Sequence, residues 1–269
     1  MNKMLVGVAI ALGAAVGAQA AGYAWDNAAE DVYADGWQSG DAGGSGWGGS
    51  WALTTTTPPD GDKAGFLVGT SQNNGAGNGN IDTDGVSWGM YANSTYSASA
   101  TRDFDGNLSI GQTVSLSLDN GSIDVGGSVG FTLDGHDDPG ASDQFTFYFT
   151  GGGNNYWTST GRMYWIVPTD TGVGFTSAGL DVAFTLTAAQ AYSVDITPRG
   201  GTTTTLNGTF GASANFDHVT LYNYTAGSGS GNDAFFNQIQ VGQPIPEPTT
   251  AALLGVGLAG LLGLRRRSR

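Results

Sequence analysis

Cysteine is absent from the 269 residues of this chain, and histidine is almost absent. Without thiols, stabilising disulfides, cysteine nucleophiles and thiolate metal sites are all excluded. The only imidazoles belong to His136 and His218, and no sequence pattern places the two together. A histidine-based metal site or a catalytic triad is therefore not expected.

Positive charge is scarce as well. The stretch 21–243 has 22 acidic residues and only four basic ones, which are Lys63, Arg102, Arg162 and Arg199. Such an acidic surface repels nucleic acids and anionic lipids, so neither is expected as a partner of this stretch. It suits divalent cations, cationic partners or simple solubility.

Glycine, in contrast, is abundant, with 46 residues, and Ser, Thr, Asn and Asp fill many of the gaps between glycines. This composition alone would suggest disorder. The aromatic residues, however, make up 11% of the chain and are spread through it rather than clustered. We therefore expect a folded chain that is rich in turns.

Alternation of apolar and polar residues dominates the middle of the chain, and no stretch there has a helical period. This alternation predicts short strands that each bury one face. The apolar stripes lie at 114–118, 129–133, 145–149, 180–186, 194–196 and 219–223, and a closing strand is expected at 234–241.

Many short strands with one apolar face each predict an all-β fold, an antiparallel two-sheet sandwich. The chain length fits ten or more strands better than seven, so we favour a concanavalin A-like jelly roll over an immunoglobulin-like sandwich. A single domain over residues 21–243 is large enough to bury a core of its own.

The first twenty residues have the layout of an export signal. Lys3 gives a positive start, residues 5–16 are uncharged and apolar, and Ala18 and Ala20 are the small residues that signal peptidase requires. The alternative, an N-terminal membrane anchor, is disfavoured because a bilayer span takes about 20 apolar residues. We expect a signal peptide over 1–20, cut after Ala20.

Residues 244–269 have a different layout, which also indicates a sorting signal. Pro246 and Pro248 keep Glu247 in an extended, accessible strip that a protease can bind. Residues 249–264 predict a short apolar transmembrane helix, which is marginal for a permanent span. Three basic residues follow, Arg265, Arg266 and Arg267. By the positive-inside rule they keep the end of the chain in the cytoplasm.

Together, the proline-bracketed glutamate, the apolar run and the arginines resemble the PEP-CTERM sorting tail of Gram-negative bacteria. Tails of that family are recognised by exosortase, a membrane-embedded cysteine protease or transpeptidase. The resemblance implies a protein that is exported, held in the inner membrane by its tail, and then processed.

The body is also similar to extracellular modules that often precede such tails. Three stretches carry this second resemblance: DGWQSGDAGGSGWGGSW, IDTDGVSWGMYAN and GSGSGNDAFFNQIQVG. It implies a fold and no activity.

Glycoside hydrolases occur among jelly rolls, so the carboxylates are candidates for catalysis. The retaining jelly-roll glucanases place theirs in a Glu-x-Asp-x-Glu strand, but Glu30 and Glu247 are the only glutamates here, and the motif is absent. Two aspartate pairs have i, i+2 spacing, Asp82 with Asp84 and Asp103 with Asp105. Both pairs lie beside glycine and indicate turns rather than an active site. We therefore do not expect an enzyme.

Calcium is the one metal that the sequence suggests. Four carboxylates share one loop with glycine and proline, as the hard oxygen ligands of Ca²⁺ require: Asp134, Asp137, Asp138 and Asp143. Their spacing does not match an EF-hand, and acidic turns that solvate strand ends are the favoured alternative.

Sugar binding is the other candidate chemistry, because lectins stack sugar rings on exposed aromatic side chains. Trp37, Trp47 and Trp51 lie in glycine-rich surroundings, and Trp157 follows Tyr156. The alternative, that the ring fills the core, is favoured for any single one of them.

These observations predict an exported, exosortase-processed protein of the cell surface or extracellular matrix, whose sandwich structures or binds exopolysaccharide. Two alternatives stay open. One is a secreted carbohydrate-active enzyme with an Asp-based site, and the other is a purely structural coat protein.

Overall fold

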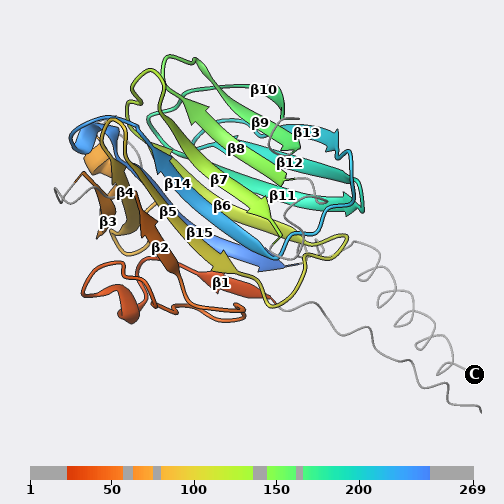
Figure 1. Cartoon of the computed structure of the whole chain (residues 1–269), viewed down its shortest axis with the longest axis horizontal. Helices are drawn as coiled ribbons and strands as arrows, with labels where there is room; N and C mark the ends of the chain where they lie inside the picture. The colour runs from red at the N-terminus through yellow and green to blue at the C-terminus, as the bar shows by residue number, and fades with distance from the viewer. Residues whose placement is uncertain (1–22, 57–62, 75–79, 136–143, 162–165, 243–269) are drawn as a thin grey trace, which may run out of the picture.

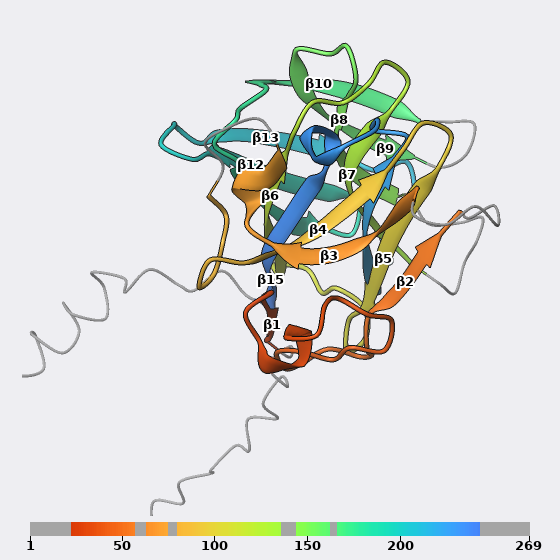
Figure 2. The same ribbon diagram turned by 90° about the vertical axis from the view of Figure 1, so that its left-hand side faces the viewer.

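The structure, a computed structural model, describes residues 23–56, 63–74, 80–135, 144–161 and 166–242. In this part of the chain fifteen strands form two antiparallel sheets that pack face to face (Figures 1 and 2). The predicted all-β sandwich is thereby confirmed. The predicted signal peptide at 1–20 and the predicted tail at 244–269 lie outside the described residues.

The first sheet has eight strands. Its order is β13 (Thr204–Thr209), β12 (Ala191–Pro198), β11 (Leu180–Ala188), β6 (Thr113–Asn120), β15 (Ala234–Gly242), β4 (Ser87–Ala92) and β3 (Ala64–Gly69), and β1 (Ala24–Asp26) also pairs with β15. We call it the eight-stranded sheet.

The second sheet has seven strands. Its order is β10 (Val167–Gly174), β9 (Asn155–Gly161), β8 (Gln144–Thr150), β7 (Ser128–Asp134), β14 (His218–Tyr224), β5 (Ser97–Asp103) and β2 (Ala52–Thr55). We call it the seven-stranded sheet.

Helical structure is slight. The described residues contain only three one-turn 3-10 helices, η1 (Asp31–Tyr33), η2 (Ser71–Asn74) and η3 (Ser230–Asn232). No helix in this part of the chain is long and apolar enough to cross a membrane. The transmembrane helix predicted at 249–264 lies outside it and stays a prediction.

The core lies between the sheets because alternate residues of each strand point inward. Leu116 of β6 and Phe184 of β11 are buried from one sheet, and Phe145 of β8 is buried from the other. The ring centroids of Phe145 and Phe184 lie 4.6 Å apart across the interface between the sheets. Since the chain has no disulfide, burial of apolar area, at about 25 cal/mol per Å², is the main source of its stability.

The predicted stripes match seven of the fifteen strands and miss β1–β5, β9, β10 and β13. Three of the missed strands, β2, β10 and β13, share one feature. Each is the last strand at one edge of its sheet. Their side chains are mostly exposed or half-buried, so their sequences carry no apolar stripe. An edge strand is held by backbone hydrogen bonds on one side only, and its side chains need not be apolar.

Candidate functional site

The outer face of the seven-stranded sheet brings aromatic residues of separate strands into one line. The strand register places Tyr222 of β14 opposite Gly130 of β7, Gly130 opposite Tyr148 of β8, and Tyr148 opposite Trp157 of β9. Strands β14, β7, β8 and β9 lie side by side in Figure 1. Tyr224, two residues beyond Tyr222, extends the line along β14. We call these four residues, Tyr148, Trp157, Tyr222 and Tyr224, the aromatic face.

The two tyrosines of β14 stack on each other. Their ring centroids lie 4.4 Å apart with an interplanar angle of 22°, and Tyr224 is 41% exposed whereas Tyr222 is 6% exposed. Burial raises the pKa of Tyr222 above its ordinary value, so its phenol stays protonated at physiological pH and can donate a hydrogen bond. Tyr224 therefore exposes its ring to solvent while that ring stacks on the buried ring of Tyr222.

Gly130, in the middle of the aromatic face, has no side chain because the neighbouring strand lies too close for one. An added Cβ at this position would lie 2.0 Å from the carbonyl oxygen of Phe147 in the neighbouring strand, so no side chain can be placed there without moving backbone. Gly130 is nevertheless buried, so the strand is covered at this point and is not itself open to a ligand. The surface that a ligand can contact here is formed by the side chains of the aromatic face.

A row of hydroxyl groups runs beside the aromatic face. It crosses five strands in register, through Thr101, Thr220, Thr132, Thr146 and Ser159. The hydroxyls of Thr101 and Thr220 lie 2.8 Å apart, and those of Thr132 and Thr146 lie 3.3 Å apart. A hydroxyl group has one donor and two acceptor positions, so each pair keeps hydrogen-bonding capacity for a ligand.

The next row on the same sheet is charged. His218 stands between Asp103 and Asp134 in the register, and its Nδ1 lies 2.7 Å from Oδ1 of Asp217. Gln144 donates from Nε2 to Oδ2 of Asp134 at 3.4 Å. The sheet thus presents aromatic, hydroxyl and carboxylate rows one after another, which are the groups that bind polyhydroxylated ligands.

Sequence reasoning found only Trp157 among the four residues of the aromatic face. The three tyrosines were missed because alternation shows which residues point outward but not which strands are neighbours. The available signal was that Tyr148, Tyr222 and Tyr224 stand between or beside residues of the core stripes.

Two of the tryptophans predicted to bind sugar belong to the core instead. Trp37 is 4% exposed and Trp51 is 1% exposed. Their rings pack edge to face at 5.2 Å, and both contact Trp88. Their glycine-rich surroundings do not uncover the rings but let backbone approach closely, since a Cβ on Gly43 would lie 2.6 Å from atoms of Asp26 and Tyr33. For Trp37 and Trp51, the sugar-binding role is therefore corrected to a packing role.

The other two tryptophans are half-buried. The Nε1 atom of Trp47 donates to the carbonyl oxygen of Trp25 at 3.0 Å, and the guanidinium of Arg102 lies 5.2 Å from the Trp47 ring. Trp157 lies on the aromatic face. A sugar-binding role for either one stays a prediction.

The predicted calcium loop is described only at its first residue. Oδ1 of Asp134 accepts from the backbone N–H of Gly135 at 2.8 Å, while Asp137, Asp138 and Asp143 lie outside the described residues. In the described part of the chain no cluster of three or more His, Asp and Glu side chains is suited to a metal ion. Calcium binding by this loop stays a prediction.

The aspartate pair at 82 and 84 is a turn, as expected. Asp82 accepts hydrogen bonds from the backbone N–H of Ser71 at 2.9 Å and from the hydroxyls of Thr70 and Ser87 at 2.7 Å each. Burial acts to raise the pKa of Asp82, but these hydrogen bonds outweigh it, so the pKa is lowered. A carboxylate held in this way ties the turn to η2 and is not poised as a general acid.

The signal residues predicted at the two ends, Ala18 and Ala20 and, in the tail, Pro246, Glu247, Pro248, Arg265, Arg266 and Arg267, lie outside the described residues. Signal cleavage at Ala18 and Ala20 stays a prediction, whereas the tail is supported by sequence comparison. Residues 244–267 match the family of the PEP-CTERM protein-sorting motif. The resemblance of the tail is thus confirmed.

Other comparisons concern the sandwich. One similar solved structure is a β-glucanase of Bacillus licheniformis, with 10% identity, coverage of 83% of this chain and 99% of that one, and a TM-score of 0.46. Another is the globular domain of T. cruzi calreticulin, with 14% identity, coverage of 80% of this chain and 90% of that one, and a TM-score of 0.47. A third is an immunostimulatory antigen and pseudo β-1,3-glucanase of Mycobacterium tuberculosis, with 12% identity, coverage of 72% of this chain and 91% of that one, and a TM-score of 0.45. At these identities and TM-scores none of them bears on activity or ligand.

No curated protein matches the chain in sequence. What is known of this chain therefore comes from the match of its tail, residues 244–267, and from the observed architecture of the described residues. This chain carries a PEP-CTERM sorting motif behind an antiparallel two-sheet sandwich, and the motif marks an exported protein that exosortase processes.

Proposed function

We propose that this protein is held at the bacterial cell surface or in the extracellular matrix and binds exopolysaccharide there without cleaving it. The aromatic face, Tyr148, Trp157, Tyr222 and Tyr224, is the single observation that carries the proposal. Aromatic rings pack against the apolar faces of sugar rings, while the adjoining hydroxyl row can bind the sugar hydroxyls. The motif-directed export brings this face to where bacterial polysaccharide is found.

The ligand that fits this face is uncharged. Among the described residues no Lys or Arg belongs to the aromatic face. Arg102 is buried, Arg199 pairs with Asp181 of the eight-stranded sheet at 2.8 Å, and Nζ of Lys63 lies 5.4 Å from the centroid of the Tyr96 ring. Asp103, Asp134 and Asp170 lie on the same face of the sheet and would repel uronic acid or sulfate groups.

Alanine variants of the aromatic face test the proposal. Trp157→Ala and Tyr224→Ala should each weaken binding to soluble neutral glucans about tenfold, or roughly 1.4 kcal/mol, in affinity electrophoresis and calorimetry. Tyr23→Ala is the matched control, because Tyr23 is 55% exposed and precedes β1 of the other sheet. Equal affinity of all three variants for every polymer that binds would overturn the proposed face.

The two alternatives give different results in the same samples. A carbohydrate-active enzyme would release reducing ends from a bound polymer, and loss of that release in Asp103→Asn would assign an Asp-based site. A purely structural coat protein would bind none of the polymers in the panel, including the host's own exopolysaccharide.

A further inference from the structure

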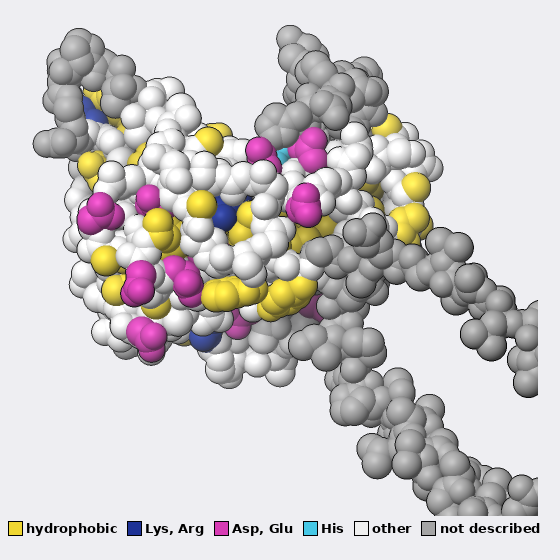
Figure 3. All heavy atoms as spheres, turned by 90° about the horizontal axis from the view of Figure 1, so that it is seen from below, with side chains coloured by type: hydrophobic (Ala, Val, Ile, Leu, Met, Phe, Trp, Pro, Cys, Tyr) yellow, Lys and Arg dark blue, Asp and Glu magenta, His cyan; other side chains and the backbone are white. Residues whose placement is uncertain are grey.

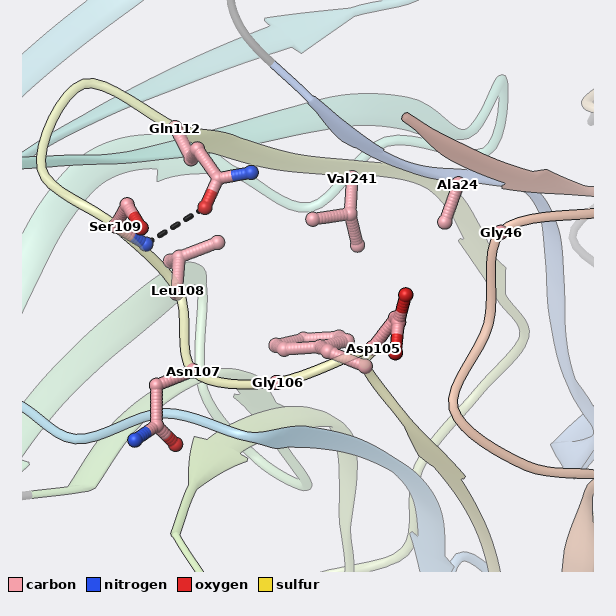
Figure 4. Close-up of a pocket in the computed structure, with 10 residues that line it drawn as sticks. Ala24, Gly46, Asp105, Gly106, Asn107, Leu108, Ser109, Gln112 and Val241 are labelled. Carbon is pink, nitrogen blue, oxygen red and sulfur yellow. Dashed lines mark hydrogen bonds between the residues drawn. The ribbon is translucent and has the colours of Figure 1, made fainter. Parts of the chain in front are cut away.

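A small cavity lies at one end of the sandwich, in the connection from β5 to β6 and beside the paired strands β1 and β15 (Figure 4). Its volume is about 120 Å³. The residues that line it are Ala24, Gly46, Phe104, Asp105, Gly106, Asn107, Leu108, Ser109, Gln112 and Val241. None of them belongs to the aromatic face, so the cavity is a separate site.

Gln112, a residue buried at the edge of this cavity, supplies a hydrogen-bond donor to it. The residue is 4% exposed, and its Oε1 accepts from the backbone N–H of Ser109 at 2.6 Å. This hydrogen bond orients the amide, and Figure 4 shows its nitrogen pointing into the space between Leu108 and Val241. Its Nε2 donates to no other described residue, and it is not one of the buried polar atoms that lack a partner, so it is open to water in the cavity. A ligand hydroxyl that accepts from this amide would take the place of that water.

Asp105 supplies an acceptor on the other side. Its side chain is exposed, and in Figure 4 its carboxylate stands across the cavity from Gln112. The side chains of Leu108, Val241 and Ala24 form apolar wall between these two polar groups. The cavity thus combines one amide donor, one carboxylate acceptor and an apolar surface.

We propose that this cavity binds a single uncharged sugar ring, the terminal or branch residue of a glycan. A hydroxyl group is suited to both ends of the cavity, because it can accept from the Gln112 amide and donate to the Asp105 carboxylate. The apolar wall fits the C–H face of the ring. The choice of a sugar rests on the proposed function, whereas the donor and acceptor arrangement stands without it.

The size and charge of the cavity restrict which ligands can bind in it. Pockets for drug-sized molecules have volumes of about 300–1,000 Å³, so a cavity of about 120 Å³ holds one ring at most. Neither Lys nor Arg lines it, and the Asp105 carboxylate repels anions. Uronic acids and phosphorylated sugars are therefore excluded as ligands.

Nuclear magnetic resonance of the ¹⁵N-labelled protein tests the site directly. The probes are the methyl glycosides of glucose, galactose, mannose and N-acetylglucosamine at millimolar concentration. At least one should cause a saturable shift of the Gln112 side-chain NH₂ signal and of the Gly106 backbone amide. No such shift with any of the four would overturn the proposal.

Variants then separate binding from general disturbance of the loop. Gln112→Glu keeps the acceptor for Ser109 but removes the donor, and Asp105→Ala changes an exposed residue that the fold does not need. Each should weaken glycoside binding at least tenfold. Ile110→Ala should leave it unchanged, because Ile110 belongs to the same connection, is 59% exposed and does not line the cavity. Equal binding by Asp105→Ala would contradict the proposal even if Gln112→Glu failed to fold.

The variant Trp157→Ala shows whether a sugar binds in the cavity or on the aromatic face. If the cavity binds sugar, this variant keeps the glycoside shifts at Gln112 while its glucan binding falls. Loss of the glycoside shifts in Trp157→Ala would place the monosaccharide on the aromatic face and overturn the cavity site. Normal glucan binding without any shift at Gln112 would leave the proposed function standing and reject the cavity alone.

Discussion

Arg102 is the most deeply buried basic residue in the described part of the chain, at 2% exposure, and it joins the two sheets. From β5 its guanidinium donates to Oδ2 of Asp26 on β1 at 3.1 Å, and the hydroxyl of Tyr33 donates to the same oxygen at 2.5 Å. The guanidinium also lies 5.2 Å from the Trp47 ring and 5.4 Å from the Trp51 ring. A buried ion pair of this kind is far more costly to break than to replace by apolar residues.

Arg102→Met should therefore lower the free energy of unfolding by about 3–5 kcal/mol, because Asp26 would remain buried without its counter-charge. Urea unfolding followed by tryptophan fluorescence measures this. Arg199→Met is the control: the Arg199–Asp181 pair is partly exposed, at 32% and 51%, and exposed pairs contribute about 0–1 kcal/mol. Similar losses in the two variants would contradict the assigned role of Arg102.

Buried carboxyl groups make stability depend on pH. Burial raises the pKa of Asp233 from 3.8 to about 7, and it raises the pKa of Asp26 and Asp119 to about 6 although hydrogen bonds and cations near them act to lower it. The folded protein therefore binds these protons more tightly than the unfolded chain. Their contribution to stability is full below pH 3.8 and is lost as the pH rises through 6 to 7.

Asp233→Asn should stabilise the protein at pH 8, by about 2 kcal/mol, and have little effect at pH 4, because asparagine is neutral at both values. Urea unfolding of both proteins across this range measures the difference. A wild-type protein more stable at pH 8 than at pH 5, or an Asn variant with the same pH slope, would contradict the raised pKa.

At the scale of elements, β15 is held at its irregular point by one buried amide. Asn237 is fully buried; its Oδ1 accepts from the backbone N–H of Ala28 at 3.0 Å, and its Nδ2 donates to the carbonyl oxygens of Ile81 and Val86 at 3.0 Å each. The strand register shifts directly after it, where Gln238 has a φ of 53°. The side chain thus attaches two loops to an interior strand of the eight-stranded sheet.

Asn237→Ala should cost about 3 kcal/mol, because it takes away the partner of the Ala28 N–H and of the Ile81 carbonyl oxygen, whereas the Val86 carbonyl oxygen still accepts from the Thr83 N–H. Native-state hydrogen exchange should show faster exchange of the Ala28 amide. Asn207→Ala, on the exposed edge strand β13, should change stability by less than about 0.5 kcal/mol. An unchanged Ala28 amide in Asn237→Ala would show that another contact holds this loop.

At the scale of the whole molecule, negative charge is spread over the surface. Figure 3, a view from below, shows acidic side chains at several places and few basic ones. Binding to neutral glucans should therefore be insensitive to salt between low and high ionic strength, because no ion pair forms. Affinity electrophoresis in both buffers measures this, and DNA should not bind in either. A steep loss of glucan binding with salt would indicate a charged ligand contact.

Processing of the tail gives a second whole-molecule prediction. In cells with exosortase, the mature protein should end near 246–248 and be found at the surface or in the medium. In cells without exosortase the tail should remain, and the protein should stay in the membrane fraction. Intact mass spectrometry and fractionation measure both properties. Retention of Arg269 in both strains would make the tail an ordinary anchor.

The sequence by itself identified the sorting signal and showed which residues of the central strands point into the core. A sorting tail is read as a linear motif, so residues 244–267 need no fold to be recognised. Alternation likewise reports burial directly: the stripes at 114–118, 129–133 and 145–149 match strands β6, β7 and β8, whose apolar residues are buried. Both signals are local in the chain, since a strand's neighbours in sequence set which side each residue points to.

Only the tertiary structure decided which outward residues meet. Tyr148, Trp157 and Tyr222 form one surface because β14 lies beside β7, although the two strands are separated by six others along the chain. The same holds for Trp37 and Trp51: the sequence left open whether each ring fills the core or binds a sugar, and in the structure other rings cover both. Sheet order depends on the packing of distant strands against a shared core, and no local pattern contains that information.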